Sequence, residues 1–262
     1  MIKAMRSASS GMLAQQMNVD NIANNLANVN TTGYKRSRVE FQDVLYQNLR
    51  RAGTATSLGT SAPTNLDVGY GTRAVSTVRE FSTGDLTQTG NALDLAIEGN
   101  GFFQISMPDG TTSYTRDGAL KVSAEGRVVT SDGFFLYPEI TIPDNAESIS
   151  VSMDGDVSVK LVGNDEPQSI GRLELAKFIN PAGLSAVGHN LYNQTLASGA
   201  PILAGPTEEG MGKIDQGYLE ISNVRVVDEM VNMIVAQRAY ELNSKVIQTS
   251  EDMTQIVNNL KR

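Results

Sequence analysis

The chain of 262 residues contains no cysteine and no tryptophan, and only 6% of its residues are aromatic. The absence of cysteine excludes disulfide bonds, zinc–thiolate sites and thiol chemistry. Apolar residues make up 40% of the sequence, which is low for a globular chain, so the hydrophobic core is modest for this length. We therefore expect an elongated molecule that is stabilised partly by contacts with neighbouring molecules.

Long apolar runs are also absent. The first residues lack the continuous apolar segment of a secretory signal, and Phe134–Tyr137 is among the longest apolar runs. Such runs are too short to cross a bilayer, and the N-terminal segment has amides where an interfacial helix has cations. The sequence predicts no direct membrane insertion, and export of the chain would need a route that does not use a cleaved signal peptide.

Positive charge is scarce in the middle of the chain. Residues 52–218 contain nine Lys/Arg and twenty Asp/Glu, a net charge of −11. Residues 1–51 contain seven Lys/Arg and three Asp/Glu, a net charge of +4. Nucleic-acid binding needs clustered cations, so this distribution predicts no nucleic-acid partner. We interpret the small basic excess as a solvated or interface patch that consists of Lys35, Arg36, Arg38, Arg50 and Arg51.

Glycine and proline are nearly missing from both ends of the chain. All eight Pro and all but two of the 24 Gly lie between Gly53 and Gly217. Both ends instead have apolar residues with a seven-residue period, which predicts coiled-coil helices over about residues 2–28 and 227–260. The predicted seam consists of Met5, Met12, Val19, Leu26, Val235, Leu242, Val246, Met253, Ile256 and Leu260.

A second stripe of the N-terminal helix consists of amide side chains. Asn21, Asn24, Asn25 and Asn28 follow the spacing i, i+3, i+4, i+7 of one helix face. Asn is a poorer helix former than Lys or Glu, and an amide can be buried without the desolvation cost of a charge. We expect this amide face either to pack against other helices or to be a solvated face without a role. Gly33 is expected to end the helix in the left-handed conformation.

The middle of the chain has the pattern of β-structure. Asp-Gly or Glu-Gly pairs that begin at positions 109, 117, 125 and 132 separate short segments, and this spacing predicts an antiparallel meander. The expected fold class is α+β, with the terminal helices paired as a coiled-coil layer and a mainly antiparallel β domain inserted between them. The expected domains are a helical domain of residues 1–33 and 220–262, a connecting extension of residues 34–68 and a β domain of residues 69–219.

The sequence offers little for catalysis. His189 is the only histidine, and no nucleophile or set of metal ligands is visible around it. The glycine-rich segment Gly69–Ala74 is followed by residues typical of a strand, so it does not predict a dinucleotide site, and Asp154–Asp156 is too short for a calcium loop. We expect no catalytic, cofactor-binding or metal-binding residues, no cofactor and no enzyme activity. A cell-wall hydrolase is the alternative from another class, and it would need a carboxylate pair or a metal in a cleft.

Three regions of the chain resemble the bacterial flagellar rod and hook proteins. The N-terminal strings are SSGMLA at 9–14 and NIANNLANVNTTGYK at 21–35, and the central strings are TGNALDLAIEGNGFF at 89–103 and YTRDG at 114–118. The C-terminal strings are EMVNMI at 229–234, QRAYE at 237–241 and NSK at 243–245. Residues 144–210 match weakly. The length of the chain and the string FQDVLYQ at 41–47 favour a subunit of the distal rod, with a proximal rod or hook subunit as the alternative.

The resemblance implies a structural subunit. Copies of such proteins stack head-to-tail into a helical tube, which transmits torque across the periplasm and encloses the export channel. Heterologous contacts that do not close into a ring give open filaments of this kind. The resemblance also implies a place in the flagellar basal body and type III export without a cleaved signal peptide. The expected partners are further copies, other rod proteins, the hook protein and the surrounding ring proteins, and the seam residues are expected to be buried against helices of neighbouring subunits.

Overall fold

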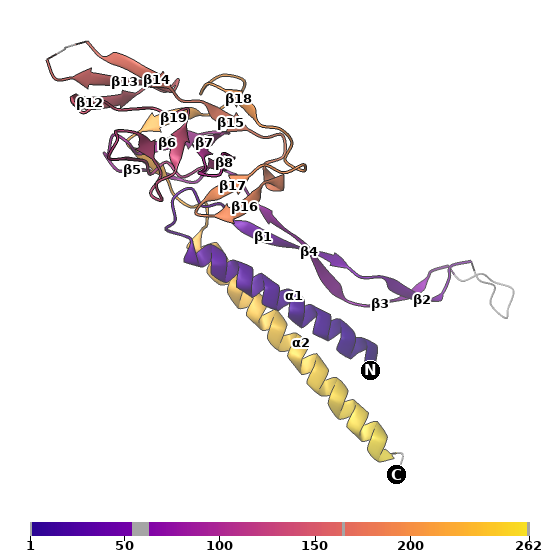
Figure 1. Cartoon of the computed structure of the whole chain (residues 1–262). Helices are drawn as coiled ribbons and strands as arrows, with labels where there is room; N and C mark the ends of the chain where they lie inside the picture. The colour runs from indigo at the N-terminus through magenta and orange to yellow at the C-terminus, as the bar shows by residue number, and fades with distance from the viewer. Residues whose placement is uncertain (1, 54–62, 164–165, 261–262) are drawn as a thin grey trace. The chain divides into compact units, whose positions relative to one another are not determined.

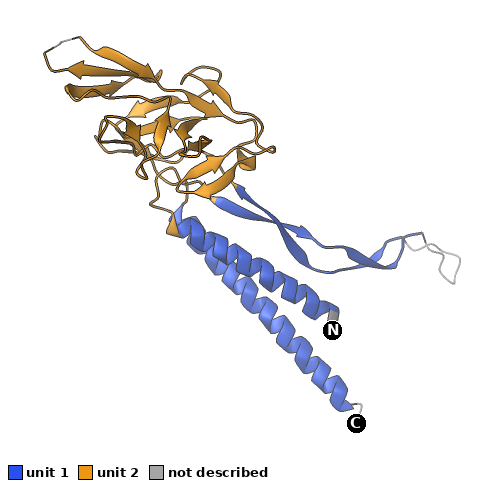
Figure 2. Cartoon of the chain, viewed as in Figure 1, with its two compact units in different colours: residues 1–26, 37–78, 225–262 blue, residues 27–36, 79–224 orange. Residues whose placement is uncertain are grey.

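The computed structural model describes residues 2–53, 63–163 and 166–260, so residues 54–62 of the expected extension lie outside the described residues. The chain forms two compact units, which Figure 2 shows in different colours. We call residues 1–26, 37–78 and 225–262 the helical unit, and residues 27–36 and 79–224 the β unit. The chain therefore passes between the two units four times.

Two helices lie at the ends of the chain, as the seven-residue pattern predicts (Figure 1). Helix α1 spans Ile2–Ala27 and helix α2 spans Val226–Leu260. Two carboxylates, Asp228 and Glu229, lie in the first turn of α2, where negative charge interacts favourably with the helix dipole. Gly33 has the expected left-handed conformation, with φ of 65°. Because α1 already ends at Ala27, Gly33 shapes the turn after the helix rather than its last turn.

The described residues of the segment 37–78, which we call the extension from here on, form two successive two-stranded ribbons. Strand β1 (Ser37–Asp43) pairs with β4 (Thr72–Arg79), and β2 (Tyr46–Arg50) pairs antiparallel with β3 (Leu66–Gly69). Strands are favoured here because β-branched and aromatic residues such as Val39, Phe41 and Val75 pack well on a pleated surface.

The β unit contains strands β5 to β20 among its described residues. Its largest sheet has nine strands. Seven of them follow the order β16-β17-β8-β7-β11-β10-β9, β15 pairs with β7, and β18 pairs with β15. The strands of this sheet are β7 (Phe102–Ser106), β8 (Thr112–Thr115), β9 (Lys121–Val122), β10 (Val128–Val129), β11 (Phe135–Tyr137), β15 (Leu175–Lys177), β16 (Ser185–Gly188), β17 (Leu191–Asn193) and β18 (Ile202–Ala204). A short 3-10 helix, η1 (Pro181–Gly183), precedes β16.

Smaller sheets complete the β unit. They consist of β6 (Leu95–Glu98) with β19 (Lys213–Gln216), β5 (Leu86–Gln88) with β20 (Tyr218–Glu220), and the three strands β12 (Ala146–Val151), β13 (Asp156–Leu161) and β14 (Gln168–Arg172). These pairings are all antiparallel. The expected α+β class with an inserted, mainly antiparallel β domain is confirmed.

The expected meander is only partly present. Strands β9, β10 and β11 follow one another through turns at Gly126 and Gly133, which have φ of 78° and 88°. Strand β8 pairs instead with β7 and β17. The reason lies at Gly118, where a Cβ atom would be 1.6 Å from the carbonyl oxygen of Leu95. The Asp117-Gly118 pair is thus a close crossing of two segments, which only glycine permits, and not a hairpin turn.

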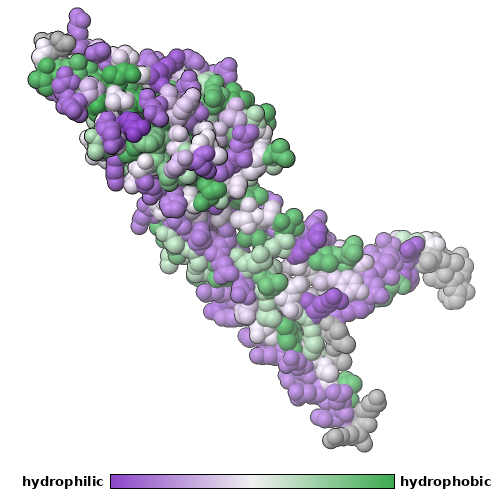
Figure 3. All heavy atoms as spheres, viewed as in Figure 1, coloured by the Kyte–Doolittle hydropathy of each residue, from purple (hydrophilic) through white to green (hydrophobic). Residues whose placement is uncertain are grey.

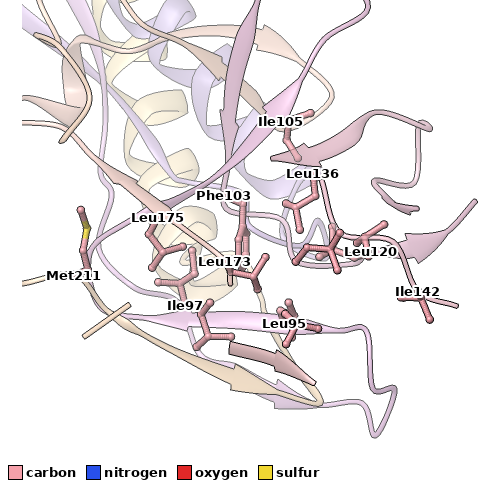
Figure 4. Close-up of a cluster of buried hydrophobic side chains, with 14 of the residues drawn as sticks. Leu95, Ile97, Phe103, Ile105, Leu120, Leu136, Ile142, Leu173, Leu175 and Met211 are labelled. Carbon is pink, nitrogen blue, oxygen red and sulfur yellow. The ribbon is translucent and has the colours of Figure 1, made fainter. Parts of the chain in front are cut away.

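The hydrophobic core lies in the β unit, and Figure 4 shows its side chains pointing toward one another. The buried cluster consists of Leu95, Ile97, Phe103, Ile105, Leu120, Val128, Leu136, Ile140, Ile142, Val157, Leu173, Leu175, Leu191, Met211 and Ile214. A second cluster has edge-to-face ring contacts, with centroids 4.8 Å to 6.1 Å apart, among Phe81, Phe102, Tyr114, Phe178 and Tyr192. Such contacts are worth about 0.5–1.5 kcal/mol each beyond the burial of area, so this ring cluster stabilises the β unit.

Candidate assembly surfaces

Helices α1 and α2 pack against each other in antiparallel orientation. A Cβ atom on Gly11 would lie 3.0 Å from the side-chain nitrogen of Asn243, and the Asn25 side chain donates a hydrogen bond of 3.3 Å to Glu229. Moving from Gly11 to Asn25 along α1 therefore corresponds to moving from Asn243 back to Glu229 along α2. In this register, α2 from Met253 onward extends beyond the start of α1, as Figure 1 shows.

Small and polar residues dominate the contact between the two helices. On α1 the buried or half-buried stripe consists of Ala8, Gly11, Gln15, Asn18, Ile22 and Asn25. On α2 it consists of Glu229, Met233, Ala236, Asn243, Ile247, Ser250 and Thr254. Both stripes have the seven-residue period of a coiled coil. Because the distance between helix axes depends on the side chains at the contact, small residues here permit a close approach.

The predicted seam lies one residue away from this contact on each helix. Val19 follows Asn18 on α1, and Val235 precedes Ala236 on α2, so each predicted stripe is rotated by about 100° from the packed stripe. The α1 members Met5, Met12, Val19 and Leu26 are half-buried. The α2 members are exposed by 45% to 81%, namely Val235, Leu242, Val246, Met253, Ile256 and Leu260. Their burial against other copies stays a prediction.

The two halves of the predicted seam do not meet within the chain. Val19 lines a groove of about 390 Å³ between the helices together with Gln16, Gln237, Tyr240 and Glu241. On a helix with 3.6 residues per turn, Val235 and Val246 project from the side of α2 opposite to Gln237 and Glu241. The helix pair therefore has one apolar stripe on each of its two sides. In Figure 3, apolar atoms alternate with hydrophilic ones along these helices.

The predicted amide face is divided between buried and exposed positions. Asn25 is buried, and its side chain donates to the Ser37 carbonyl at 2.8 Å and accepts from the Ser37 N–H at 3.0 Å. Asn21 donates to the same carbonyl at 2.7 Å. Asn24 is exposed and Asn28 is half-buried. Asn21 and Asn25 thus fasten the start of β1 to α1, and Asn25 also links α1 to α2 through Glu229.

Replacing Asn25 with Ala is expected to lower the free energy of unfolding by about 2–3 kcal/mol, because the Ser37 N–H and the Glu229 carboxylate would lose a hydrogen bond in a buried site. Asn24→Ala, an exposed position on the same helix, is the control, with an expected change below about 0.5 kcal/mol. Urea unfolding followed by circular dichroism measures both values. Equal, small changes for the two variants would contradict the buried link.

Three charged side chains are buried together in the β unit. Lys35, Arg116 and Glu220 are exposed by 0%, 2% and 2%. Lys35 Nζ donates to Glu220 Oε1 at 2.6 Å and to the Ser82 carbonyl at 2.7 Å, and the Gly84 N–H donates to the same Oε1 at 2.8 Å. Arg116 Nη1 lies 3.7 Å from Glu220 Oε2. The Glu220 carboxylate thus interacts with two buried cations and joins segments that are distant in the sequence.

Burial dominates the electrostatics of this ion cluster. Removal from water, together with the positive charge of Arg116, lowers the pKa of Lys35 to about 8, although Glu220 acts in the opposite direction. Burial also lowers the pKa of Arg116. The Arg116 guanidinium donates to the carbonyl oxygens of Ile97 at 3.2 Å and Gly99 at 2.6 Å. These hydrogen bonds offset part of the free-energy cost of removing the Arg116 guanidinium from water.

The position of Lys35 corrects the interpretation of the basic patch. Lys35 was expected to be solvated or at an interface, but its side chain is fully buried. Arg36 is half-buried beside the Glu80 carboxylate, and Arg38 is exposed beside Glu40 of the same strand. Sequence reasoning missed Arg116 and Glu220 altogether, because Lys35 and Glu220 are 185 positions apart and nothing local marks them as partners.

The extension lies against α1 at Gly71. A Cβ atom on Gly71 would be 2.0 Å from Ser10 Oγ and 3.2 Å from the Cα of Ser7, and φ of Gly71 is 103°. The Thr72 N–H donates to Ser10 Oγ at 3.3 Å. Only glycine permits both this conformation and this approach. Large apolar side chains of the extension remain exposed, among them Leu45, Tyr46, Leu49 and Leu66.

The segments examined for chemistry have structural explanations. His189 and Asn190, with φ of 53° and 58°, are the two-residue loop between β16 and β17, as in a type I′ hairpin turn. Asp154–Asp156 includes the turn between β12 and β13, and Gly69–Ala74 joins β3 to β4 without a following helix. The described residues contain no group of three His, Asp or Glu side chains placed to hold a metal ion. Neither described helix has an apolar stretch long enough to cross a membrane.

In comparison with known proteins, three regions of the chain match families of flagellar rod and hook proteins. Residues 5–35 match the flagella basal body rod protein family, residues 96–159 match the flagellar hook protein FlgE/F/G D1 domain, and residues 215–260 match the C-terminal region of the flagellar basal body rod FlgEFG proteins. The chain is 52% identical to the flagellar basal-body rod protein FlgG of Borreliella burgdorferi, over 100% of both chains. The chain belongs to the FlgG family of flagellar basal-body rod proteins.

Two further relatives support membership of the FlgG family. The chain is 49% identical to FlgG of Caulobacter vibrioides, over 99% of this chain and 100% of the relative. It is 39% identical to FlgG of Bacillus subtilis, over 100% of both chains. The resemblance found in the sequence strings is confirmed. The matched ranges include most of α1 and α2, so both helices that present the apolar stripes are family features.

Proposed function

We propose that the chain is a structural subunit of the distal rod of the flagellar basal body, and that copies of it assemble into a helical tube that transmits torque and encloses the export channel. The proposal rests on the apolar stripe of α2, where Val235, Leu242 and Val246 are 61%, 62% and 45% exposed in the single chain. Side chains of this kind at seven-residue spacing are stabilised when another helix covers them, by about 1.5–3 kcal/mol for each fully buried residue. The relatives are named basal-body rod proteins, which supports the same function.

The placement of the two stripes favours an open assembly. The Val19 stripe and the Val235 stripe lie on opposite sides of the helix pair, so one copy offers two different surfaces. A contact between unlike surfaces is heterologous, and repeated heterologous contacts that do not close give a filament. The end of α2 beyond Met253 adds an apolar segment for a contact with the next copy along the tube, with Ile256 and Leu260 exposed by 59% and 81%.

The remaining parts of the proposal follow from family membership. The proposed place is the basal body, where the rod spans the periplasm, and the proposed route is type III export without a cleaved signal peptide. Further copies, other rod proteins, the hook protein and the surrounding rings are the proposed partners, without nucleic acid and without direct membrane insertion. The proposed functional parts are residues 1–33 with 220–262 as the inner helical layer, 34–68 as the bridging extension and 69–219 as the outer β domain. The chain is proposed to have no enzyme activity.

Electron microscopy of the purified chain at stepwise increasing concentration tests the proposal. Straight, stiff filaments with a central channel are expected above a critical concentration. Curved or short filaments would favour the hook or proximal rod as the place of this subunit. A chain that remains monomeric at every concentration would contradict self-assembly, and cleavage of peptidoglycan by the purified chain would contradict the absence of enzyme activity.

A further inference from the structure

One segment of the β unit has no charged side chains. Between Lys177 and Glu208 the sequence contains no Asp, Glu, Lys or Arg. The β unit as a whole has ten Lys/Arg and twenty Asp/Glu, a net charge of −10. A surface formed by residues 178–207 therefore differs in kind from the acidic remainder of the unit. We call it the uncharged face.

The uncharged face presents large apolar side chains on segments that are joined to one another. Asn180 Nδ2 donates to the Ala197 carbonyl at 3.0 Å, and Thr195 Oγ1 donates to the Gly183 carbonyl at 2.6 Å. These bonds connect the loop after β15 to the loop after β17. In Figure 3, apolar atoms protrude at the right-hand margin of the β unit, where Figure 1 draws the orange segments between β15 and β18. The exposed apolar residues of the face are Ile179, Val187, Leu196, Ile202 and Leu203.

Leu196 stands at the tip of a turn that is held by its own hydrogen bonds. Thr195 Oγ1 accepts from the N–H groups of Ala197 at 3.1 Å and Ser198 at 3.2 Å. Ser198 is 1% exposed, and its hydroxyl donates to the Thr195 carbonyl at 2.9 Å. Leu196 itself is 105% exposed, and Ile179 on the adjoining loop is 83% exposed. A side chain presented on an ordered turn loses little backbone freedom when it is covered, which favours binding.

We propose that the uncharged face is the surface through which the β unit contacts a second copy of this chain, with Leu196 and Ile179 buried in the contact. Two β units that each have a net charge of −10 repel each other where carboxylates face carboxylates. A contact through residues 178–207 brings the copies together without that repulsion. A cationic partner would instead be attracted to the carboxylates outside this segment. This inference rests on the proposed self-assembly.

Thiol labelling in filaments tests the contact, and the absence of native cysteine makes a single introduced thiol a clean reporter. Leu196→Cys is compared with Val162→Cys, a control in the turn after β13 that is 72% exposed in the single chain. We expect maleimide to label the thiol at position 196 about tenfold more slowly in filaments than in single chains, because the contact excludes solvent. The thiol at position 162 is expected to keep its rate. Unchanged labelling at position 196, or equal protection at both positions, would overturn the proposal.

A charge variant gives a second measurement. Leu196→Glu is expected to raise the critical concentration for filaments about tenfold, the change that corresponds to about 1.4 kcal/mol, whereas Val162→Glu leaves it unchanged. Circular dichroism of the single chains checks that both variants fold. If wild-type chains form no filaments at any concentration, self-assembly itself is wrong. If wild-type and Leu196→Glu filaments form at the same concentration, self-assembly holds and the proposed contact is wrong.

Discussion

Replacing Glu220 with Gln is expected to lower the free energy of unfolding of the β unit by about 3–5 kcal/mol, because removal of one partner leaves buried charges without compensation. In the wild type, Lys35 Nζ lies 2.6 Å from Glu220 Oε1, and the Arg116 guanidinium lies 3.7 Å from Oε2. Gln has nearly the same shape as Glu, so the variant tests the charge rather than the packing. Urea unfolding followed by tyrosine fluorescence measures the effect.

Two further variants separate the ion cluster from an ordinary salt bridge. Glu98→Gln removes the carboxylate of an exposed pair, in which Lys213 Nζ lies 2.6 Å from Glu98 Oε2, and exposed pairs contribute little to stability. The double variant Lys35→Met with Glu220→Gln removes one of the two buried cations. It is expected to be less destabilised than the sum of its single variants, because the residues interact directly. A Glu220→Gln chain as stable as the Glu98→Gln chain would refute a role for the ion cluster in stability.

Replacing Leu242 with Glu is expected to raise the critical concentration of filaments about hundredfold, which corresponds to about 2.7 kcal/mol. Leu242 is 62% exposed in the single chain, and the proposed contact covers it with a helix of another copy. A carboxylate at this position would lose both the apolar burial and its hydration. Pelleting assays over a range of concentrations measure the shift.

The matched control for Leu242→Glu is Lys245→Gln, which changes the net charge by the same amount. Lys245 is exposed, and helix geometry places it on the face of α2 that points away from α1 and between the two apolar stripes. Its filaments are expected to form at the wild-type concentration. The single chains of both variants are expected to keep the wild-type helix content, because neither side chain is buried. If both variants polymerise like the wild type, the apolar stripe of α2 is not a subunit contact.

Local patterns allowed the helices and several of the strands to be predicted. The seven-residue period marked both helices to within one or two residues of their ends. Glycines at Gly126 and Gly133 marked two hairpin turns. The predicted meander is wrong at Gly118, because an acidic residue followed by glycine also occurs where two backbone segments cross closely. A turn signal reports backbone conformation and small size, not which strand lies opposite.

The sequence did not allow us to predict which stripe of each terminal helix packs against the other helix. Two neighbouring stripes on each helix share the seven-residue period, and the more apolar one was chosen as the seam. The structure packs the other stripe within the chain, through Gly11, Asn25 and Glu229. The stripe that packs is selected by the close approach of Gly11 to Asn243 and by the buried hydrogen bond from Asn25 to Glu229. Both contacts depend on which residues of the other helix lie opposite.

The sequence by itself determined what depends on neighbours within a few positions: two long amphipathic helices, an inserted antiparallel β region with an acidic charge, and the family strings. Only the tertiary structure decided which stripe of α2 contacts α1, which amides are buried, and that Lys35, Arg116 and Glu220 share one buried site. The physical reason is the range of the interactions. Helix and turn preferences act along the chain, whereas burial and charge pairing depend on residues that only folding brings together.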